Sequence, residues 1–199
     1  MEKHEHSGLK RQSFGNPKEV LMQAGIAPGD SVLLDIGAGT GYLTIAAAQI
    51  MGNNAHVYAL ESHEASMRAL KKECEDNGIQ NISVIHADAT KHIPIARDSV
   101  DICLMSNVVH GFVTNGEMTS VLKNLHMVHK DDGKLIVIDF QKTPMATLLF
   151  GPPNDIRLTP DQIDTIISPY GYVREHMFSI GATHYGMVFK KTCLQNKWC

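Results

Sequence analysis

Residues 32–41 read Val-Leu-Leu-Asp-Ile-Gly-Ala-Gly-Thr-Gly, and this stretch decides the fold of the chain. Its apolar first half is typical of a buried strand in a parallel sheet. The alternating glycines then lead into residues 42–51, whose apolar side chains recur at helical spacing. A glycine-rich turn between a strand and a helix lets a ligand approach bare backbone and leaves the first helix amides free to donate hydrogen bonds. The stretch therefore predicts a strand, a ligand-binding turn and a helix.

The spacing of the glycines distinguishes between two kinds of ligand. A dinucleotide-binding turn requires Gly-x-Gly-x-x-Gly, and the third glycine would fall where this chain has Tyr42. The third glycine is instead Gly41, and Asp35 precedes the first one. A carboxylate at this place repels a pyrophosphate but can pair with a cationic ligand. S-adenosylmethionine (SAM) carries an ammonium and a sulfonium and no phosphate, so the motif favours SAM over a nicotinamide dinucleotide.

Polar side chains follow three further predicted strands at the point where each strand ends. These strands are residues 56–60, 82–86 and 100–105. Glu61 follows the first of them and lies ~20 residues beyond Gly41, the spacing at which a carboxylate meets ribose hydroxyls. Asp88 follows the second strand and Asn107 the third. Because ligands of open α/β sheets bind outside the carboxyl ends of the strands, we expect these side chains to share one site with Asp35.

With these features the chain resembles the class I SAM-dependent methyltransferases, and more closely their small ubiquinone/menaquinone-biosynthesis-type (type 11) branch. The resemblance covers about Pro17 to Lys191 and is most specific in residues 35–41. It implies a Rossmann-like, doubly wound α/β fold in three layers, with a seven-stranded sheet of order 3-2-1-4-5-7-6 and an antiparallel last strand. The remaining strands are expected within residues 134–140, 171–180 and 185–190, and helices at residues 17–25 and 117–128.

The resemblance also implies which residues bind the cofactor. In the glycine turn, Gly37, Ala38, Gly39 and Gly41 would contact the methionine moiety of SAM. Glu61 with the adjoining Ser62 would bind the ribose, and Asp88 with Ala89 the adenine. The expected product of the cofactor is S-adenosylhomocysteine.

Three residues are candidates for the side of the site that faces the methyl acceptor. His110 follows Asn107 by three positions, where it can take a proton from the acceptor or instead bond to backbone at a helix start. His184 precedes the last strand and is expected to approach the same pocket. Arg157 can bind a carboxylate or phosphate of the substrate, or it can fasten a loop to the domain.

Two segments without a regular period, residues 1–16 and 141–158, are expected to flank and cover the active site. The second is long and rich in Pro and Gly, as active-site lids often are. His4 and His6 in the first segment could belong to a metal site, but such a pair on a terminus is more often incidental, so no metal is expected. Three other histidines, His63, His126 and His129, are expected on helix surfaces.

Length and composition limit the class of protein. A chain of 199 residues with 43% hydrophobic residues predicts one domain. The net charge of -3 argues against a nucleic-acid partner, and no apolar run reaches the ~20 residues that span a bilayer. The four cysteines have no C-x-x-C spacing, and the first 16 residues lack the apolar core of a secretory signal, so a cytoplasmic protein is expected. The oligomeric state stays open.

The predicted reaction is methyl transfer from SAM to a small-molecule acceptor. Because the sulfonium is already activated, the protein chiefly aligns the acceptor and excludes water, and a base is needed only when the acceptor loses a proton. The identity of the acceptor atom stays open. Three alternatives remain. One is a protein that binds SAM without catalysis, and another is a nicotinamide-dependent oxidoreductase on a similar sheet, which Tyr42 disfavours. The third is a methyltransferase of RNA or protein, which the modest basic content disfavours.

Overall fold

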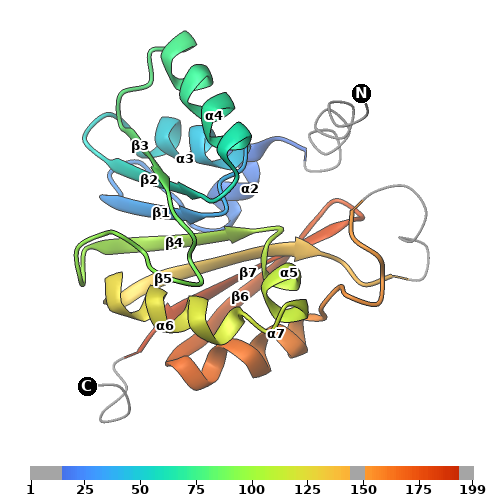
Figure 1. Cartoon of the computed structure of the whole chain (residues 1–199). Coiled ribbons are helices and arrows are strands. Elements are labelled where there is room, and N and C mark those ends of the chain that lie inside the picture. Colours follow the sequence, from blue (N-terminus) through green and yellow to red (C-terminus); the bar gives the residue numbers. More distant parts are fainter. Residues whose placement is uncertain (1–14, 144–150, 193–199) are drawn as a thin grey trace.

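The computed structural model of the chain describes residues 15–143 and 151–192 (Figure 1). Its strands are β1 (Val32–Ile36), β2 (His56–Glu61), β3 (Ile82–His86), β4 (Val100–Ser106), β5 (His129–Phe140), β6 (Tyr172–Ile180) and β7 (His184–Lys191). Its helices are α2 (Pro17–Gln23), α3 (Tyr42–Met51), α4 (Glu64–Asp76), α5 (Val109–Thr114), α6 (Met118–Val128) and α7 (Pro160–Ile167), and a 3-10 turn, η1 (Ser168–Tyr170), follows α7.

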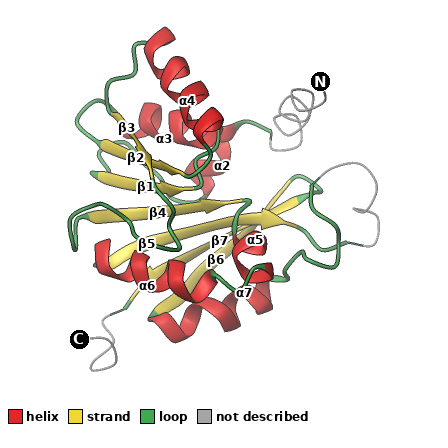
Figure 2. Ribbon diagram, in the orientation of Figure 1, coloured by secondary structure: helices red, strands yellow, loops and turns green. Residues whose placement is uncertain are grey.

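The strands form one seven-stranded sheet of order β3-β2-β1-β4-β5-β7-β6. Neighbouring strands are parallel from β3 to β5, whereas β7 runs antiparallel to both β5 and β6. Helices cover both faces of this sheet, with α2, α3 and α4 on one face and α5, α6 and α7 on the other (Figure 2). The predicted three-layer fold, the strand order and the antiparallel last strand are confirmed.

Each face of the sheet packs against its own apolar core, and β1 shows how. Leu33 packs with the core under α2 and α3, whereas Leu34 and Ile36 pack with the core under α6. All three side chains are at most 1% exposed. A strand that is buried on both faces has to be apolar at successive positions, which is why this stretch reads as a continuous hydrophobic run.

The first half of β5 differs from the prediction. The strand begins at His129 rather than Lys134, and its pairing with β4 is irregular between Val100 and Ile102. The polar residues before Lys134 include Asp132, which has a positive φ of 62°. An irregular, polar strand end of this kind lacks the period of two by which a strand is recognised in sequence.

The prediction that His129 lies on a helix surface is wrong. It is the first residue of β5 and is fully buried, and its Nδ1 lies 2.9 Å from the hydroxyl of Tyr172. Burial lowers its pKa to about 4, so the imidazole is neutral at neutral pH. His126 does lie on α6 but is half-buried, and the exposed His63 caps the start of α4.

Parts of the predicted covering segments lie outside the described residues. These parts are residues 1–14, which include His4 and His6, and residues 144–150. No helix within residues 15–143 and 151–192 is long and apolar enough to cross a membrane.

Candidate functional site

The glycine turn lies between β1 and α3, at the carboxyl ends of the parallel strands (Figure 1). Gly37, Gly39 and Gly41 all have positive φ angles, of 75°, 58° and 88°. A Cβ atom on Gly37 would lie 2.6 Å from Val108, and one on Gly41 would lie 2.2 Å from Leu70. By contrast, no atom lies within 4 Å of the corresponding position on Gly39. Packing therefore requires the outer two glycines, whereas the middle one borders open space that a ligand can fill.

Glu61 at the end of β2 is joined to this turn. Its Oε2 accepts a hydrogen bond of 2.7 Å from the amide of Gly39, and its Oε1 accepts one of 2.7 Å from the amide of His63. The residue is 8% exposed. A carboxylate has about four acceptor positions, so both oxygens keep capacity for further donors, such as vicinal hydroxyls.

Asp35 lies beneath the turn, and its surroundings differ from those of Glu61. It is 3% exposed, and its Oδ2 accepts a hydrogen bond of 2.6 Å from Thr44 on α3. Burial raises its pKa to about 7, the charge of Glu61 adds to this rise, and the bond from Thr44 opposes it. Asp35 thus ties β1 to the first turn of α3. Its expected contact with SAM stays a prediction.

The loop after β3 is also held in place by short contacts. Asp88 Oδ1 accepts from the amide and the hydroxyl of Thr90, at 2.9 and 2.7 Å, and Lys91 lies 3.1 Å from its other oxygen. The bond from the Thr90 hydroxyl is the main reason that the pKa of Asp88 is lowered. Asn124 on α6 donates to the carbonyl of the buried Ala89. Next to Glu61, the carbonyl of Ser62 lies 3.1 Å from the His86 ring.

Asn107, directly after β4, combines an unusual backbone with an unsatisfied side chain. Its φ is 58°, and its amide donates to the carbonyl of Ile138 at 2.8 Å. Its Oδ1 is buried and has no hydrogen-bond partner among the described residues. Leaving a buried acceptor unpaired costs about 1–3 kcal/mol. A bound donor such as an ammonium group would remove this cost, so the residues present fit the expected cofactor.

His110, in the first turn of α5, is bound to a carboxylate that the sequence analysis missed. Its Nδ1 lies 2.7 Å from Asp139 Oδ1, and its backbone amide donates to Asp139 Oδ2 at 3.1 Å. The His110 side chain is 12% exposed, whereas that of Asp139 is 1% exposed. When Nδ1–H donates to the carboxylate, Nε2 is the nitrogen that can accept a proton. The available signal was an acidic residue inside the apolar run that ends at Phe140.

His184 lies beside Phe140, the residue that follows Asp139, and its predicted contact with the substrate stays a prediction. It is the first residue of β7, opposite Phe140 of β5, and the two ring centroids are 4.3 Å apart. It is 1% exposed, and its Nδ1 lies 2.8 Å from the Thr183 hydroxyl. Burial lowers its pKa to about 4, although the charge of Asp139 opposes this shift. His184 is therefore a neutral, packed residue beside the candidate site.

Arg157 is buried beside the same aromatic ring. Its Nε donates to the carbonyl of Pro152 at 2.9 Å, and its Nη1 donates to the carbonyl of Gln141 at 3.0 Å. Its guanidinium carbon lies 5.2 Å from the centre of the Phe140 ring, and the residue is 2% exposed. Of the two predicted roles, these contacts favour fastening of the loop. A role in substrate binding stays a prediction.

No group of three or more metal-binding side chains occurs within the described ranges. The site instead consists of two adjoining parts. One is the glycine turn with Glu61 and Asn107, and the other is the pair formed by His110 on α5 and Asp139 on β5.

The sequence is similar to those of several curated methyltransferases. One is the arsenite methyltransferase of Halobacterium salinarum, 26% identical over 149 residues, which are 75% of this chain and 34% of that protein. Another is the ubiquinone/menaquinone biosynthesis C-methyltransferase UbiE of Vibrio campbellii, 31% identical over 120 residues, which are 60% of this chain and 44% of that protein. The chain thus spans less than half the length of these two relatives.

Solved structures share the fold. A SAM dependent methyltransferase from Aquifex aeolicus has a TM-score of 0.81 and 22% identity, over 92% of this chain and 93% of that one. A putative type 11 methyltransferase from Sulfolobus solfataricus has a TM-score of 0.67 and 24% identity, over 84% and 88%. Residues 29–171, which include the glycine turn and the ends of β2 to β5, match the family described as methyltransferase domain. The chain therefore belongs to the methyltransferase domain family.

Proposed function

We propose that the chain transfers a methyl group from SAM to a small-molecule acceptor and releases S-adenosylhomocysteine. The observation that carries this proposal is the open space at Gly39, whose amide donates to the Glu61 carboxylate. The unsatisfied Oδ1 of Asn107, directly after β4, supports it. Glu61 accepts from the ribose hydroxyls, and Asn107 accepts from the ammonium group. Asp88 and Ala89 border the adenine. When bound, SAM supplies an activated methyl group on its sulfonium.

The pair of His110 and Asp139 acts on the acceptor. Asp139 holds the imidazole of His110 through its Nδ1. The other nitrogen, Nε2, then takes the proton of an acceptor hydroxyl, thiol or acidic carbon. The buried carboxylate also stabilises the imidazolium that forms. In this proposal His110 is the catalytic base, and Asp139 is a positioning residue.

Arg157 supports this reaction from the loop that follows β5. By binding the carbonyls of Gln141 and Pro152, it holds the two described ends of the loop near Phe140. In this proposal the described residues 151–158 cover the acceptor side and exclude water, as a lid does. Together with the sheet they belong to a single methyltransferase domain.

The net charge of the chain and the positions of its described thiols limit the class of methyl acceptor. A net charge of -3 disfavours nucleic acid. Among the described residues, the free thiols of Cys74 and Cys103 are buried in separate apolar clusters, so they form no common arsenite site. Free thiols also suit the reducing cytosol, which is the proposed compartment. A phenol, a quinol or another small acceptor with an ionisable proton fits the histidine base.

Methyl transfer is tested by measuring release of S-adenosylhomocysteine from SAM with a panel of acceptors. The panel contains phenols, quinols, thiols and arsenite. We expect turnover with an acceptor that loses a proton, and its loss in His110→Ala, with SAM binding retained. SAM binding without turnover on any of these acceptors would favour the non-catalytic alternative.

A further inference from the structure

The two edge strands of the sheet differ in their protection against pairing with another strand. Strand β6 is irregular between Arg174 and His176 and exposes the charged side chains of Arg174 and Glu175. Such features hinder edge-to-edge association. Strand β3 pairs regularly with β2, contains neither Pro nor a Lys, Arg, Asp or Glu, and leaves Ile82, Val84 and Ile85 only partly buried. The edge at β3 therefore lacks these protections.

The outer backbone groups of β3 are available for hydrogen bonds. At its two ends, Asn81 accepts from Val57 at 2.9 Å, and Ala87 donates to Glu61 at 3.2 Å. A parallel strand bonds to its neighbour through alternate residues, so the amides and carbonyls of Ile82 and Val84 point away from β2. No backbone hydrogen bond joins these groups to another described residue.

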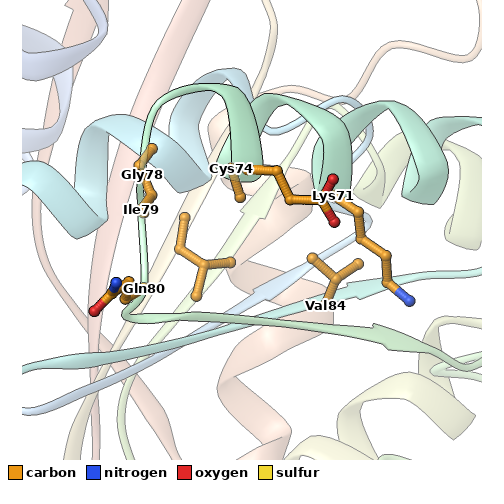
Figure 3. Close-up of a pocket in the computed structure, with 8 residues that line it drawn as sticks. Lys71, Cys74, Gly78, Ile79, Gln80 and Val84 are labelled. Atoms are coloured by element: carbon orange, nitrogen blue, oxygen red, sulfur yellow. The ribbon is translucent and has the colours of Figure 1, made fainter.

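A groove of about 490 Å³ lies beside this edge, between α4 and β3 (Figure 3). Its lining residues are Lys71, Cys74, Glu75, Gly78, Ile79, Gln80, Ile82 and Val84. Figure 3 shows Lys71 above Val84 at one end of the groove, and Gly78 with Ile79 at the other end. The floor is mainly apolar, and both charged side chains come from the helix.

These two charged side chains differ from their neighbours on α4. Glu64 with Arg68, and Lys72 with Asp76, form ion pairs between residues four positions apart. Lys71 and Glu75 have the same separation but form no ion pair within the described part of the chain. The groove wall thus carries one positive and one negative group about one helical turn apart. A two-fold axis would match each group with its opposite on an identical surface.

We propose that β3 pairs antiparallel with β3 of a second copy of this chain, centred on Ser83, so that the two sheets become continuous. In this register Val84 faces Ile82 of the second copy, and each residue uses both its outward amide and its outward carbonyl. The apolar side chains of these residues then lie side by side over the two grooves. Lys71 of each copy pairs with Glu75 of the other. This dimer does not depend on the proposed methyl transfer.

The test is the molar mass of the full chain by sedimentation equilibrium over a range of concentrations. We expect a reversible dimer with twice the 21.9 kDa mass of one chain. Lys71→Glu or Glu75→Lys alone should raise the dissociation constant of the dimer by about tenfold or more, because like charges then face each other. The double variant with both changes should restore association. The matched control Glu175→Lys, on the opposite edge, should leave association unchanged.

A second variant tests the strand pairing itself. Val84→Pro removes an amide that points outward and that the monomer does not use, so the fold is retained while the dimer is lost. Circular dichroism checks the fold of each variant. If Val84→Pro does not fold, the exposed charge variants still decide the question. A chain that is monomeric at all concentrations would overturn the proposal. A dimer whose dissociation constant is unchanged by these charge reversals would overturn it as well.

Discussion

At the scale of the residue, Asp139 makes the sharpest prediction about chemistry. Asp139→Asn keeps the size of the side chain but removes the charge that holds the His110 imidazole. We expect kcat to fall by about a hundredfold or more, with little change in SAM affinity. The pH dependence of kcat should also change, which a purely structural role of Asp139 would not cause.

The control for this variant is Asp132→Asn, an exposed aspartate near the other end of the same strand, close to Lys190. It should retain kcat and the wild-type pH profile. A full rate in Asp139→Asn, at every pH, would mean that the pair has no part in the reaction.

Buried titratable residues also predict how stability depends on pH. His129 and His184 have a pKa of about 4 in the fold, against 6.5 for a free histidine, so between these values the unfolded chain binds more protons. The stability that depends on these neutral imidazoles is therefore fully present above pH 6.5. As the pH falls towards 4, the free energy of unfolding decreases by up to about 3 kcal/mol for each of them. Asp35 has the opposite sign, because its raised pKa of about 7 makes the fold bind a proton in this window.

The combined effect of the two histidines on stability is larger than the opposite effect of Asp35. The free energy of unfolding should therefore rise between pH 4 and pH 6.5. Urea unfolding at several pH values measures this slope. His129→Gln should reduce the slope, because it removes one of the two buried imidazoles. A wild-type stability that does not vary with pH in this window would contradict the assignment.

At the scale of the element, the glycine turn contains one glycine required for packing, Gly41, and one proposed to border the ligand, Gly39. Gly41→Ala places a methyl group against Leu70 at a positive φ, so it should lower the free energy of unfolding by about 2–4 kcal/mol. Gly39→Ala meets no neighbour and should cost only about 1–2 kcal/mol of stability. Its methyl group enters the space proposed for SAM, so it should weaken SAM binding strongly. Equal losses of stability, with SAM affinity unchanged in Gly39→Ala, would refute this division.

The loop after β5 makes a prediction at the same scale. Arg157→Lys cannot reproduce both bonds of the guanidinium to the carbonyls of Pro152 and Gln141. We expect the free energy of unfolding to fall by about 1–3 kcal/mol and proteolysis of the loop to accelerate. If stability is unchanged and only the KM of the acceptor rises, Arg157 binds substrate instead.

At the scale of the whole molecule, the sheet was predictable because its central strands are apolar on both faces and because polar residues or glycines follow their ends, such as Gly37 after β1 and Asn107 after β4. β1 and α3 have the predicted bounds for this reason. The burial of His129 was not predictable, because the polar residues before Lys134 hide the start of β5 in the sequence. The pairing of Asp139 with His110 was not predictable either, because it is a side-chain contact between residues 29 positions apart. The link between Asp35 and Thr44 was also missed, since hydrogen bonds of side chains leave no period in a sequence.

The glycine turn, Glu61 and Asn107 are proposed to form a SAM site, and calorimetric titration of the purified chain measures this binding directly. We expect SAM and S-adenosylhomocysteine to bind and NAD not to bind. Glu61→Gln should weaken the affinity for SAM by about tenfold or more, whereas the matched control Glu175→Gln should leave this affinity unchanged. Failure to bind SAM, or SAM binding that is indifferent to Glu61→Gln, would contradict the account.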